Sequence, residues 1–348
     1  MKPTAKFFLG ANSHKGFCSY FSQLQEKKHP PRLIILKGGP GSGKSSLMKK
    51  VLSHILSLGH DVEMIPCASD PKSLDAVIDH TKNFAIMDGT APHAMDPLLP
   101  GAQQHILNMG DLWDSKKLAF NCDSIAKLTE LIGDCHKGAC SYINAAHSLL
   151  CENERISKKY INQKEALTLA LDISGNFLRK KAGGETKRLL SAVSVDGIEF
   201  FTDTVSVYAD KVFVISDEWG GLSDYIMNKV YSAATLAEEE IIYCPCSISP
   251  EKCDHLIFPD SRLAVLKDNS FLKIPYAEKI NAYDYYFSIP MQHSLKKRKE
   301  SASGLLLEAG KMISDAKFLH DELEAFYVSA MNFERTNALY EDIKNRFC

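Results

Sequence analysis

The chain contains two copies of one pattern. Residues 6–88 and 187–267 match along their length, at an offset that falls from 181 to 179 after a two-residue deletion. The stretch from Phe8 to Gly16 aligns with the stretch from Leu189 to Gly197. Identical residues further along are Pro66 and Pro245, Cys67 and Cys246, Pro71 and Pro250, and Asp75 and Asp254. A spacing shared through several elements predicts two copies of the same fold.

Each copy alternates short apolar runs with a helical pattern, which is typical of an α/β fold with a parallel sheet. The strand-like runs of the first copy are Phe7 to Ala11, Leu33 to Leu36, Val62 to Ile65 and Phe84 to Met87. Those of the second copy are Arg188 to Ala192, Val212 to Ile215, Glu240 to Tyr243 and Leu263 to Leu266. A helix is expected from Ser45 to Leu58. We therefore expect two tandem lobes, each built on a parallel sheet.

Helical apolar spacing follows each of these regions, from about Gln103 to Lys181 and from about Asn281 to the C-terminus. Each α/β core is thus expected to carry a helical appendage. The glycine pair in Ala182-Gly183-Gly184 marks the junction between the copies. The expected first lobe is 1–181, with its core at about 1–102 and helices at about 103–181, and the second is 182–348, with its core at about 182–280 and a helical region at about 281–348.

Composition excludes several classes of protein. The chain has 348 residues, of which 45% are hydrophobic and 24% charged, so it can bury real cores and is not disordered. With 41 basic and 43 acidic residues the net charge is −2, which disfavours nucleic acid as a partner. No apolar run approaches the ~20 residues that span a bilayer, and no secretory signal begins the chain. We expect a cytoplasmic protein with no membrane partner and with reduced cysteines.

A phosphate-binding motif follows the second apolar run. It satisfies G-x-x-x-x-G-K-[ST] and consists of Gly38, Gly39, Pro40, Gly41, Ser42, Gly43, Lys44 and Ser45, with Ser46 opening the helical run. The glycines allow backbone N–H groups to turn toward phosphate oxygens, and the helix N-terminus adds partial positive charge. Lys44 is expected to bridge the β- and γ-phosphates, and Ser45 to offer its hydroxyl to Mg²⁺.

A Mg²⁺ ion at such a loop also needs an acidic residue at the end of a buried strand. Asp88 supplies it directly after Phe84 to Met87, on the next strand but one. Asp70 is a weaker candidate, because it is also placed to cap a helix expected from Pro71 to Asp79. Thr90 and His93 continue from Asp88 and are candidates to position a water or an acceptor hydroxyl, although a loop histidine is usually just solvated.

The second copy has lost this chemistry. At the same offset Lys44 becomes Ser223, Ser45 becomes Asp224 and Asp88 becomes Lys267. Two acids, Asp217 and Glu218, stand where the loop begins. A triphosphate would meet like charge there with no lysine to offset it, so we expect a degenerate lobe that acts as scaffold or lid.

A zinc site in the second copy is a less favoured hypothesis. Cys244, Cys246, Cys253 and His255 offer four soft ligands within twelve residues. Their spacing departs from the common C-x-x-C pairs, and Cys246 matches Cys67, which has no partner cluster. Core cysteines at strand ends are the better interpretation.

Several stretches of the sequence form one set of motifs: Phe8 to Asn12 with Gly16-Phe17, Leu36 to Ser45, and Ala85 to His93 with Asp96-Pro97 and Pro100-Gly101-Ala102. This set resembles a bacterial family of duplicated P-loop ATPase-like (P-loop NTPase) proteins. The resemblance covers essentially the full length, and Asp88-Gly89-Thr90-Ala91-Pro92-His93 is its most specific mark. It implies a cytoplasmic ATP-binding protein, labelled an ATPase or nucleotide kinase. The family's second lobe often has a phosphate loop too, which this chain lacks. The expectation that the nucleotide is ATP and not GTP rests on this resemblance and on the lack of an N-K-x-D guanine signature.

The expected fold is therefore two tandem P-loop NTPase-type lobes, the second degenerate. The leading functional hypothesis is Mg-dependent ATP binding and hydrolysis at the single N-terminal site, coupled to movement between the lobes. A small-molecule or nucleotide kinase using the same site is the alternative. A nucleotide-gated binding or scaffold protein with negligible turnover is the third. A protein partner or a small-molecule acceptor is possible, and the sequence identifies neither.

Overall fold

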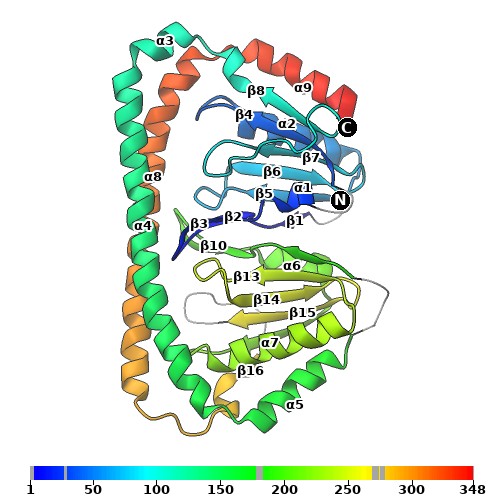
Figure 1. Ribbon diagram of the computed structural model, residues 1–348, viewed down its shortest axis with the longest axis vertical. Coiled ribbons are helices and arrows are strands. Elements are labelled where there is room, and N and C mark those ends of the chain that lie inside the picture. Colours follow the sequence, from blue (N-terminus) through cyan, green and yellow to red (C-terminus); the bar gives the residue numbers. More distant parts are fainter. Residues whose placement is uncertain (1–3, 27–29, 178–182, 269–273, 275–278, 348) are drawn as a thin grey trace. The chain divides into compact units, whose positions relative to one another are not determined.

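The computed structural model describes residues 4–26, 30–177, 183–268, 274 and 279–347. Within them the chain forms two compact units, each assembled from separate stretches of sequence (Figure 1). Unit 1 consists of Met1–Gly10, Ser19–Gly138 and Lys311–Cys348, and unit 2 of Ala11–Cys18 and Ala139–Gly310.

Unit 1 is built on a six-stranded sheet. Its strands, in the order in which they lie side by side, are β1 (Ala5–Lys6), β5 (Val62–Pro66), β6 (Leu74–Asp79), β7 (Phe84–Asp88), β4 (Arg32–Lys37) and β8 (Gln104–Asn108). β4 pairs in parallel with β7 and β8, and β1 with β5, but β6 is antiparallel to both of its neighbours. The sheet is therefore mixed, mostly parallel, where the sequence predicts a purely parallel one.

Two strands of this sheet were predicted as helix. β6 occupies the stretch expected to be helical from Pro71 to Asp79, and β8 begins the region expected to be helical from Gln103. All residues of β6 are buried. A short apolar run that is buried on both faces lacks the alternation of a strand, so its periodicity does not separate strand from helix.

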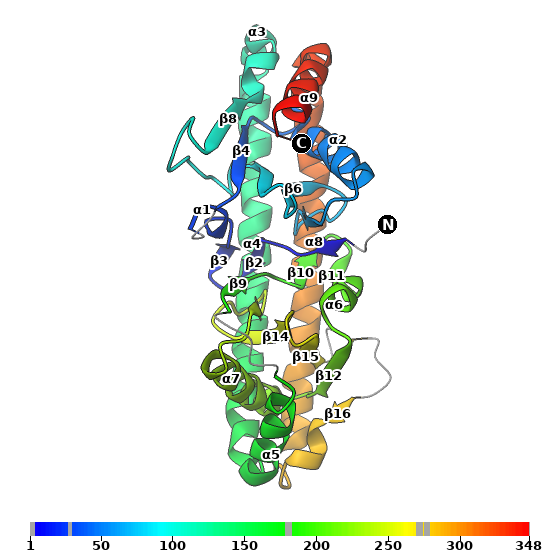
Figure 2. The ribbon, with the colours of Figure 1, turned by 90° about the vertical axis from the view of Figure 1, so that its right-hand side faces the viewer.

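Helices cover one face of the sheet in unit 1. They are α2 (Lys44–Ser57), which matches the predicted helix, and α9 (Phe333–Phe347). Leu47 of α2 and Ile343 and Phe347 of α9 lie in one buried core with apolar residues of β4 to β7. Figure 2 shows the two helices alongside each other.

Unit 2 repeats the topology of unit 1. Its strands, in spatial order, are β16 (Ile280–Asn281), β12 (Lys211–Ser216), β15 (Leu263–Asp268), β14 (Cys253–Phe258), β13 (Ile241–Pro245) and β9 (Glu185–Lys187). β14 is antiparallel to its neighbours, as β6 is, and the remaining pairs are parallel. Read from the other edge, this is the strand order of unit 1, and the predicted duplication is confirmed in the topology.

Shorter elements complete the units. Unit 1 also contains α1 (Gln23–Glu26), η1 (Met109–Leu112) and α3 (Ser115–Phe120). Two hairpins are formed by β2 (Gly10–Ser13) with β3 (Gly16–Ser19) and by β10 (Ser191–Ser194) with β11 (Gly197–Phe200). The helices of unit 2 include α5 (Gln163–Ser174), α6 (Thr202–Tyr208), α7 (Gly221–Leu236), η2 (Lys158–Tyr160) and η3 (Ala282–Tyr285).

Two long helices, α4 (Cys122–Ser157) and α8 (Gln292–Ala330), contribute to both units. This differs from the expected division, which gives helices 103–181 to the first lobe and 281–348 to the second. At 1.5 Å per residue, helices of this length extend roughly 55 Å, well beyond one small domain. The expected boundary at 181/182 lies outside the described residues. None of the helices in the described ranges has the length and apolar character needed to cross a bilayer.

Candidate active site

The predicted phosphate motif forms the connection between β4 and α2. We call residues 38–45 the glycine-rich loop. Gly41 and Gly43 have φ angles of 66° and 84°, in the left-handed region that glycine adopts without strain. Gly43 is the N-cap of α2, and Ser46 lies exposed in the first turn of that helix. The turn that the motif requires is therefore present, with the N-terminus of a helix behind it.

Lys44 folds back over this loop. Its ammonium donates to the carbonyl oxygens of Gly38 and Gly39, both at 2.8 Å, and its side chain is largely buried. The hydroxyl of Ser42 donates to the same Gly39 carbonyl at 2.7 Å. Lys44 Nζ also lies 3.5 Å from Asp88 Oδ2. The cation is thus held by acceptors of its own loop and by one acid.

Asp88 reaches Lys44 because β7 lies directly beside β4. The two strands are parallel, with Asp88 opposite Leu36. Along the chain β7 is the third strand after β4, not the second as the sequence predicted, because β6 was taken for helix. The carboxyl ends of adjacent parallel strands meet at one edge, where ligands of open α/β sheets bind.

Thr90 fixes the orientation of Asp88. Both the backbone N–H of Thr90, at 2.9 Å, and its hydroxyl, at 2.5 Å, donate to Asp88 Oδ1. The other oxygen, Oδ2, remains directed at Lys44. The hydroxyl proton of Thr90 is therefore engaged by the Asp88 carboxylate.

His93 is buried, which contradicts the expectation of a solvated loop histidine. Its Nε2 lies 3.2 Å from a carboxylate oxygen of Asp75, and its ring packs on Phe21 with centroids 4.8 Å apart. Burial lowers the pKa of His93, but the charge of Asp75 and its hydrogen bond outweigh burial, and the pKa is raised. Asp88 acts in the same direction and Lys44 in the opposite one, so all four side chains share one electrostatic environment.

Asp75 is the residue of this group that the sequence analysis did not select. It is buried in β6, at the strand taken for helix. A signal was available, because Asp75 is identical to Asp254 in the aligned second copy. In unit 2 Asp254 is likewise buried and faces a cation.

Asp70 lies away from the Lys44–Asp88 pair. Its Oδ1 accepts from the backbone N–H of Lys72 at 3.2 Å, and Lys317 of α8 lies 3.7 Å from its Oδ2. The capping role for a helix after Asp70 is wrong, because β6 follows. Among the described residues no contact joins Asp70 to Ser45 or Asp88, so nothing in the structure supports a metal role for Asp70.

The C-terminal half of α8 packs against the glycine-rich loop. No local pattern in the sequence predicts this contact. Glu324 Oε1 accepts from the backbone N–H of Gly41 at 3.3 Å. A Cβ on Gly39 would lie 2.6 Å from the Tyr327 ring, so only glycine fits there. His320 Nδ1 lies 3.6 Å from Glu324 Oε1. A carboxylate of the protein thus accepts from one amide of the loop.

The donor set at this edge suits Mg²⁺ and phosphate. Ser45 offers a hydroxyl, whose oxygen now accepts from the Leu74 N–H at 3.0 Å, and Asp88 offers a carboxylate. Oxygen ligands of this kind are those that Mg²⁺ takes in combination with phosphate oxygens. The residues therefore fit a Mg²⁺–triphosphate ligand.

The corresponding loop of unit 2 is shorter. β12 ends at Ser216 and α7 begins at Gly221, which leaves four residues where unit 1 has six, Gly38 to Gly43. Ser223 and Asp224, which align with Lys44 and Ser45, lie inside the first turn of α7. In the aligned sequence the helix thus begins two residues earlier than α2 does.

Asp217 fills the N-terminus of α7 with a carboxylate. This buried side chain accepts from the backbone N–H of Trp219 at 3.1 Å and of Ser223 at 2.8 Å. The hydroxyl of Tyr286 donates to it at 3.2 Å, and the N–H of Leu222 donates to the Tyr286 oxygen at 2.6 Å. Three amides at this helix end, those of Trp219, Leu222 and Ser223, are thus bonded to the protein's own acceptors.

Lys267 takes the place of Asp88 in unit 2. Its ammonium lies 3.4 Å from Asp254, and both side chains are buried. Burial lowers the pKa of Lys267, but the carboxylate of Asp254 outweighs it and the pKa is raised. A buried ion pair therefore lies at the position that aligns with Asp88.

The zinc hypothesis for the cysteines of unit 2 is wrong. Cys244, Cys246, Cys253 and His255 do not converge on one point in the described part of the chain. Cys253 Sγ lies 3.4 Å from the carbonyl oxygen of His255, and Cys244 Sγ lies 3.9 Å from that of Ile242. Burial raises the pKa of Cys253 and Cys246 well above the ordinary range, as expected for core thiols.

Comparison of the chain with protein-family models, curated proteins and solved structures finds no match.

Proposed function

We propose that unit 1 binds ATP with Mg²⁺ at the glycine-rich loop and hydrolyses it, and that hydrolysis is coupled to movement between the two units. The observation that carries the proposal is the position of Lys44. Its ammonium lies over the loop carbonyls and 3.5 Å from Asp88, at the carboxyl ends of two adjacent parallel strands. A lysine, an acid and a helix N-terminus meet there, as binding of a metal-bound triphosphate requires.

Each residue has a distinct role in this proposal. The backbone N–H groups of the glycine-rich loop bind phosphate oxygens, and Lys44 moves from its loop carbonyls onto the β- and γ-phosphates. Ser45 and Asp88 would hold Mg²⁺, and the ion would supply positive charge to the phosphate oxygens. Thr90 keeps the Asp88 carboxylate in one orientation.

His93 acts as a positioning residue. Its contact with Asp75 ties the segment after β7 to β6, so the stretch from Asp88 to His93 has a fixed course along the edge of the sheet. A water placed by that segment attacks the γ-phosphate in line.

Glu324 links the site to α8. A triphosphate and the Glu324 carboxylate carry like charge, and both use the Gly41 amide, so ATP binding displaces Glu324. Because α8 contributes residues to both units, a shift of this helix is the proposed route from the nucleotide to unit 2.

The test is phosphate release from Mg-ATP by the purified full chain. The parent protein is expected to release phosphate in a Mg-dependent reaction, and Lys44→Ala to reduce the rate by at least 100-fold. Ser223→Ala, the matched change at the aligned position of unit 2, is expected to retain the parent rate. Equal rates for the parent and Lys44→Ala would overturn the proposal.

The same assay separates the alternative functions. ADP formation that appears only when a pool of small metabolites or nucleotides is added would identify a kinase at this site. ATP binding without product at high enzyme concentration would identify a nucleotide-gated scaffold. Either result rejects hydrolysis and retains the binding site.

A further inference from the structure

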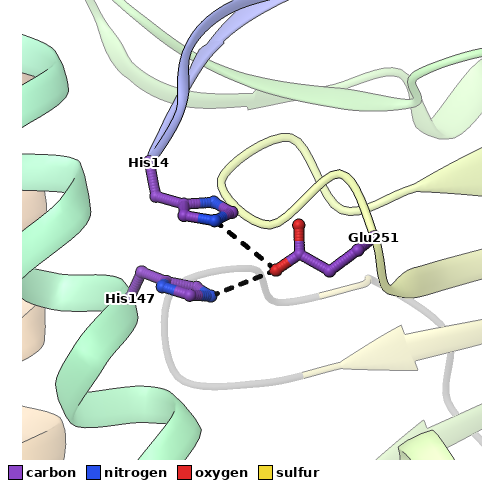
Figure 3. A group of neighbouring side chains, drawn as sticks. All are labelled: His14, His147 and Glu251. Atoms are coloured by element: carbon purple, nitrogen blue, oxygen red, sulfur yellow. Dashed lines mark ion pairs between the residues drawn. The ribbon is translucent and has the colours of Figure 1, made fainter.

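Three side chains from distant parts of the sequence converge in unit 2 (Figure 3). His14 lies in the turn of the β2–β3 hairpin, His147 on α4, and Glu251 between β13 and β14. The Nε2 atoms of His14 and His147 lie 3.6 and 3.4 Å from the same oxygen, Glu251 Oε1. The two rings are stacked, with centroids 3.9 Å apart and planes at 14°.

We propose that His14, His147 and Glu251 bind a zinc ion that holds the hairpin of Ala11–Cys18 to the rest of unit 2. Two histidines and one carboxylate, with a fourth position open to water, form an established ligand set for zinc. With bonds of about 2.0 Å and tetrahedral angles, two such ligand atoms lie about 3.3 Å apart. The observed separations from Glu251 are close to this value, and the two stacked rings must turn apart so that both lone pairs, which lie in the ring planes, meet at the ion.

The hydrogen bonds of His14 favour the metal-binding tautomer. Its Nδ1 lies 3.0 Å from the carbonyl oxygen of Ile248, which can only accept, so Nδ1 carries the proton. In the neutral ring the lone pair is then on Nε2 and faces the Glu251 oxygen. A cation between these two atoms would then be bound by both. A histidine that binds zinc commonly donates its other N–H to a backbone carbonyl in this way.

The carboxylate and His147 also have partners outside the group of three. Lys15 lies 3.3 Å from the second oxygen, Glu251 Oε2, and the hydroxyl of Ser249 donates to Oε1 at 2.9 Å. Cys151, one turn along α4 from His147, places its Sγ 3.1 Å from His147 Nε2. Lys252 Nζ donates to the same Sγ at 3.1 Å, so Cys151 has a partner of its own and is not one of the proposed ligands.

A second group of possible ligands lies in unit 1, formed by His320, Asp321 and Glu324. It is more exposed: the side chain of His320 is 41% exposed, against 10% for His14 and 16% for His147. Glu324 is also bonded to the glycine-rich loop. This group serves as the internal comparison for the proposed zinc site.

The test is a titration of metal-free full-length protein with Zn²⁺ against a chromophoric chelator, without nucleotide or Mg²⁺. The parent is expected to bind one Zn²⁺ per chain. His14→Ala and His147→Ala are each expected to weaken binding at least tenfold. His320→Ala in the other group and His293→Ala, an exposed histidine on α8, are expected to retain the parent affinity.

Thermal melting of the same proteins provides a second readout. Zn²⁺ is expected to raise the melting temperature of the parent and of His293→Ala, and not that of His14→Ala. Where an alanine variant does not fold without metal, Glu251→Gln replaces it in both measurements. The proposal is overturned if the parent binds no stoichiometric Zn²⁺, if the cluster variants bind it as tightly as the parent, or if the loss follows His320→Ala. The three side chains would then be a hydrogen-bonded group with a shared proton.

Discussion

The substitution Asp217→Asn tests how unit 2 satisfies the backbone amides at the N-terminus of α7. This helix end corresponds to the end of α2 that follows the glycine-rich loop in unit 1. The buried carboxylate accepts from two backbone amides, those of Trp219 and Ser223, and from the hydroxyl of Tyr286. Asparagine keeps the shape and one acceptor oxygen, but its amino group cannot accept a hydrogen bond. At least one buried amide therefore loses its acceptor, and α7 loses the negative charge at its N-terminus.

The expected loss of stability follows from these two effects. An unsatisfied buried donor costs about 1–3 kcal/mol, and an anion at a helix N-terminus contributes about 0.3–2 kcal/mol. The free energy of unfolding should thus fall by about 2–4 kcal/mol, which lowers the melting temperature of a unit of this size by roughly 5–15 °C.

The assay is thermal melting of the full chain, with Glu218→Gln as the control. Glu218 is the neighbouring acid, but its side chain is 45% exposed and pairs with Lys299 at 2.8 Å. Because the Glu218 carboxylate is exposed, although Lys299 is only 13% exposed, loss of this pair should change stability by about 1 kcal/mol, less than the loss at Asp217. Equal effects of the two substitutions would refute the idea that Asp217 occupies the anion position of unit 2.

Three further predictions concern unit 1. Asp88→Asn should leave ATP binding measurable but remove most of its Mg²⁺ dependence, seen as equal affinities with Mg²⁺ and with EDTA; a retained Mg²⁺ effect would remove Asp88 from the metal site. Glu324→Gln should raise ATP affinity by roughly three- to tenfold, about 1 kcal/mol, because the like charge at Gly41 is gone; unchanged affinity would mean that Glu324 is not displaced. The raised pKa of His93 means that its pairing with Asp75 stabilises unit 1 fully below about pH 6.5 and progressively less as pH rises through the raised value. The difference in melting temperature between the parent and His93→Asn should therefore be largest near pH 6 and shrink toward alkaline pH, and a constant difference would contradict the ion pair.

The sequence was sufficient for features that depend on local pattern. The glycine-rich loop, the helix after it and the strand that ends at Asp88 lie where apolar runs and glycine spacing predict them. The duplication was readable because identical residues recur at one offset, and the two sheets have the same strand order. These properties depend on neighbours in the chain, so one sequence is enough to find them.

Features that depend on tertiary packing were not predicted. β6 is buried throughout, and such a run has no periodicity that separates strand from helix; the error concealed both Asp75 and the position of β7. The contact of Glu324 with Gly41 joins residues 283 positions apart. His14 and His147 likewise meet only through folding. No spacing rule relates such residues.

The central claim is that one lobe of the duplicated chain binds a nucleoside triphosphate and the other does not. Isothermal titration calorimetry with Mg²⁺ and a non-hydrolysable ATP analogue measures this directly. One site per chain is expected for the parent and for Ser223→Ala, and no measurable site for Lys44→Ala. Saturation at 100 times the dissociation constant should also stabilise the parent by about 2.7 kcal/mol. Two sites per chain, or one site of unchanged affinity in Lys44→Ala, would contradict it.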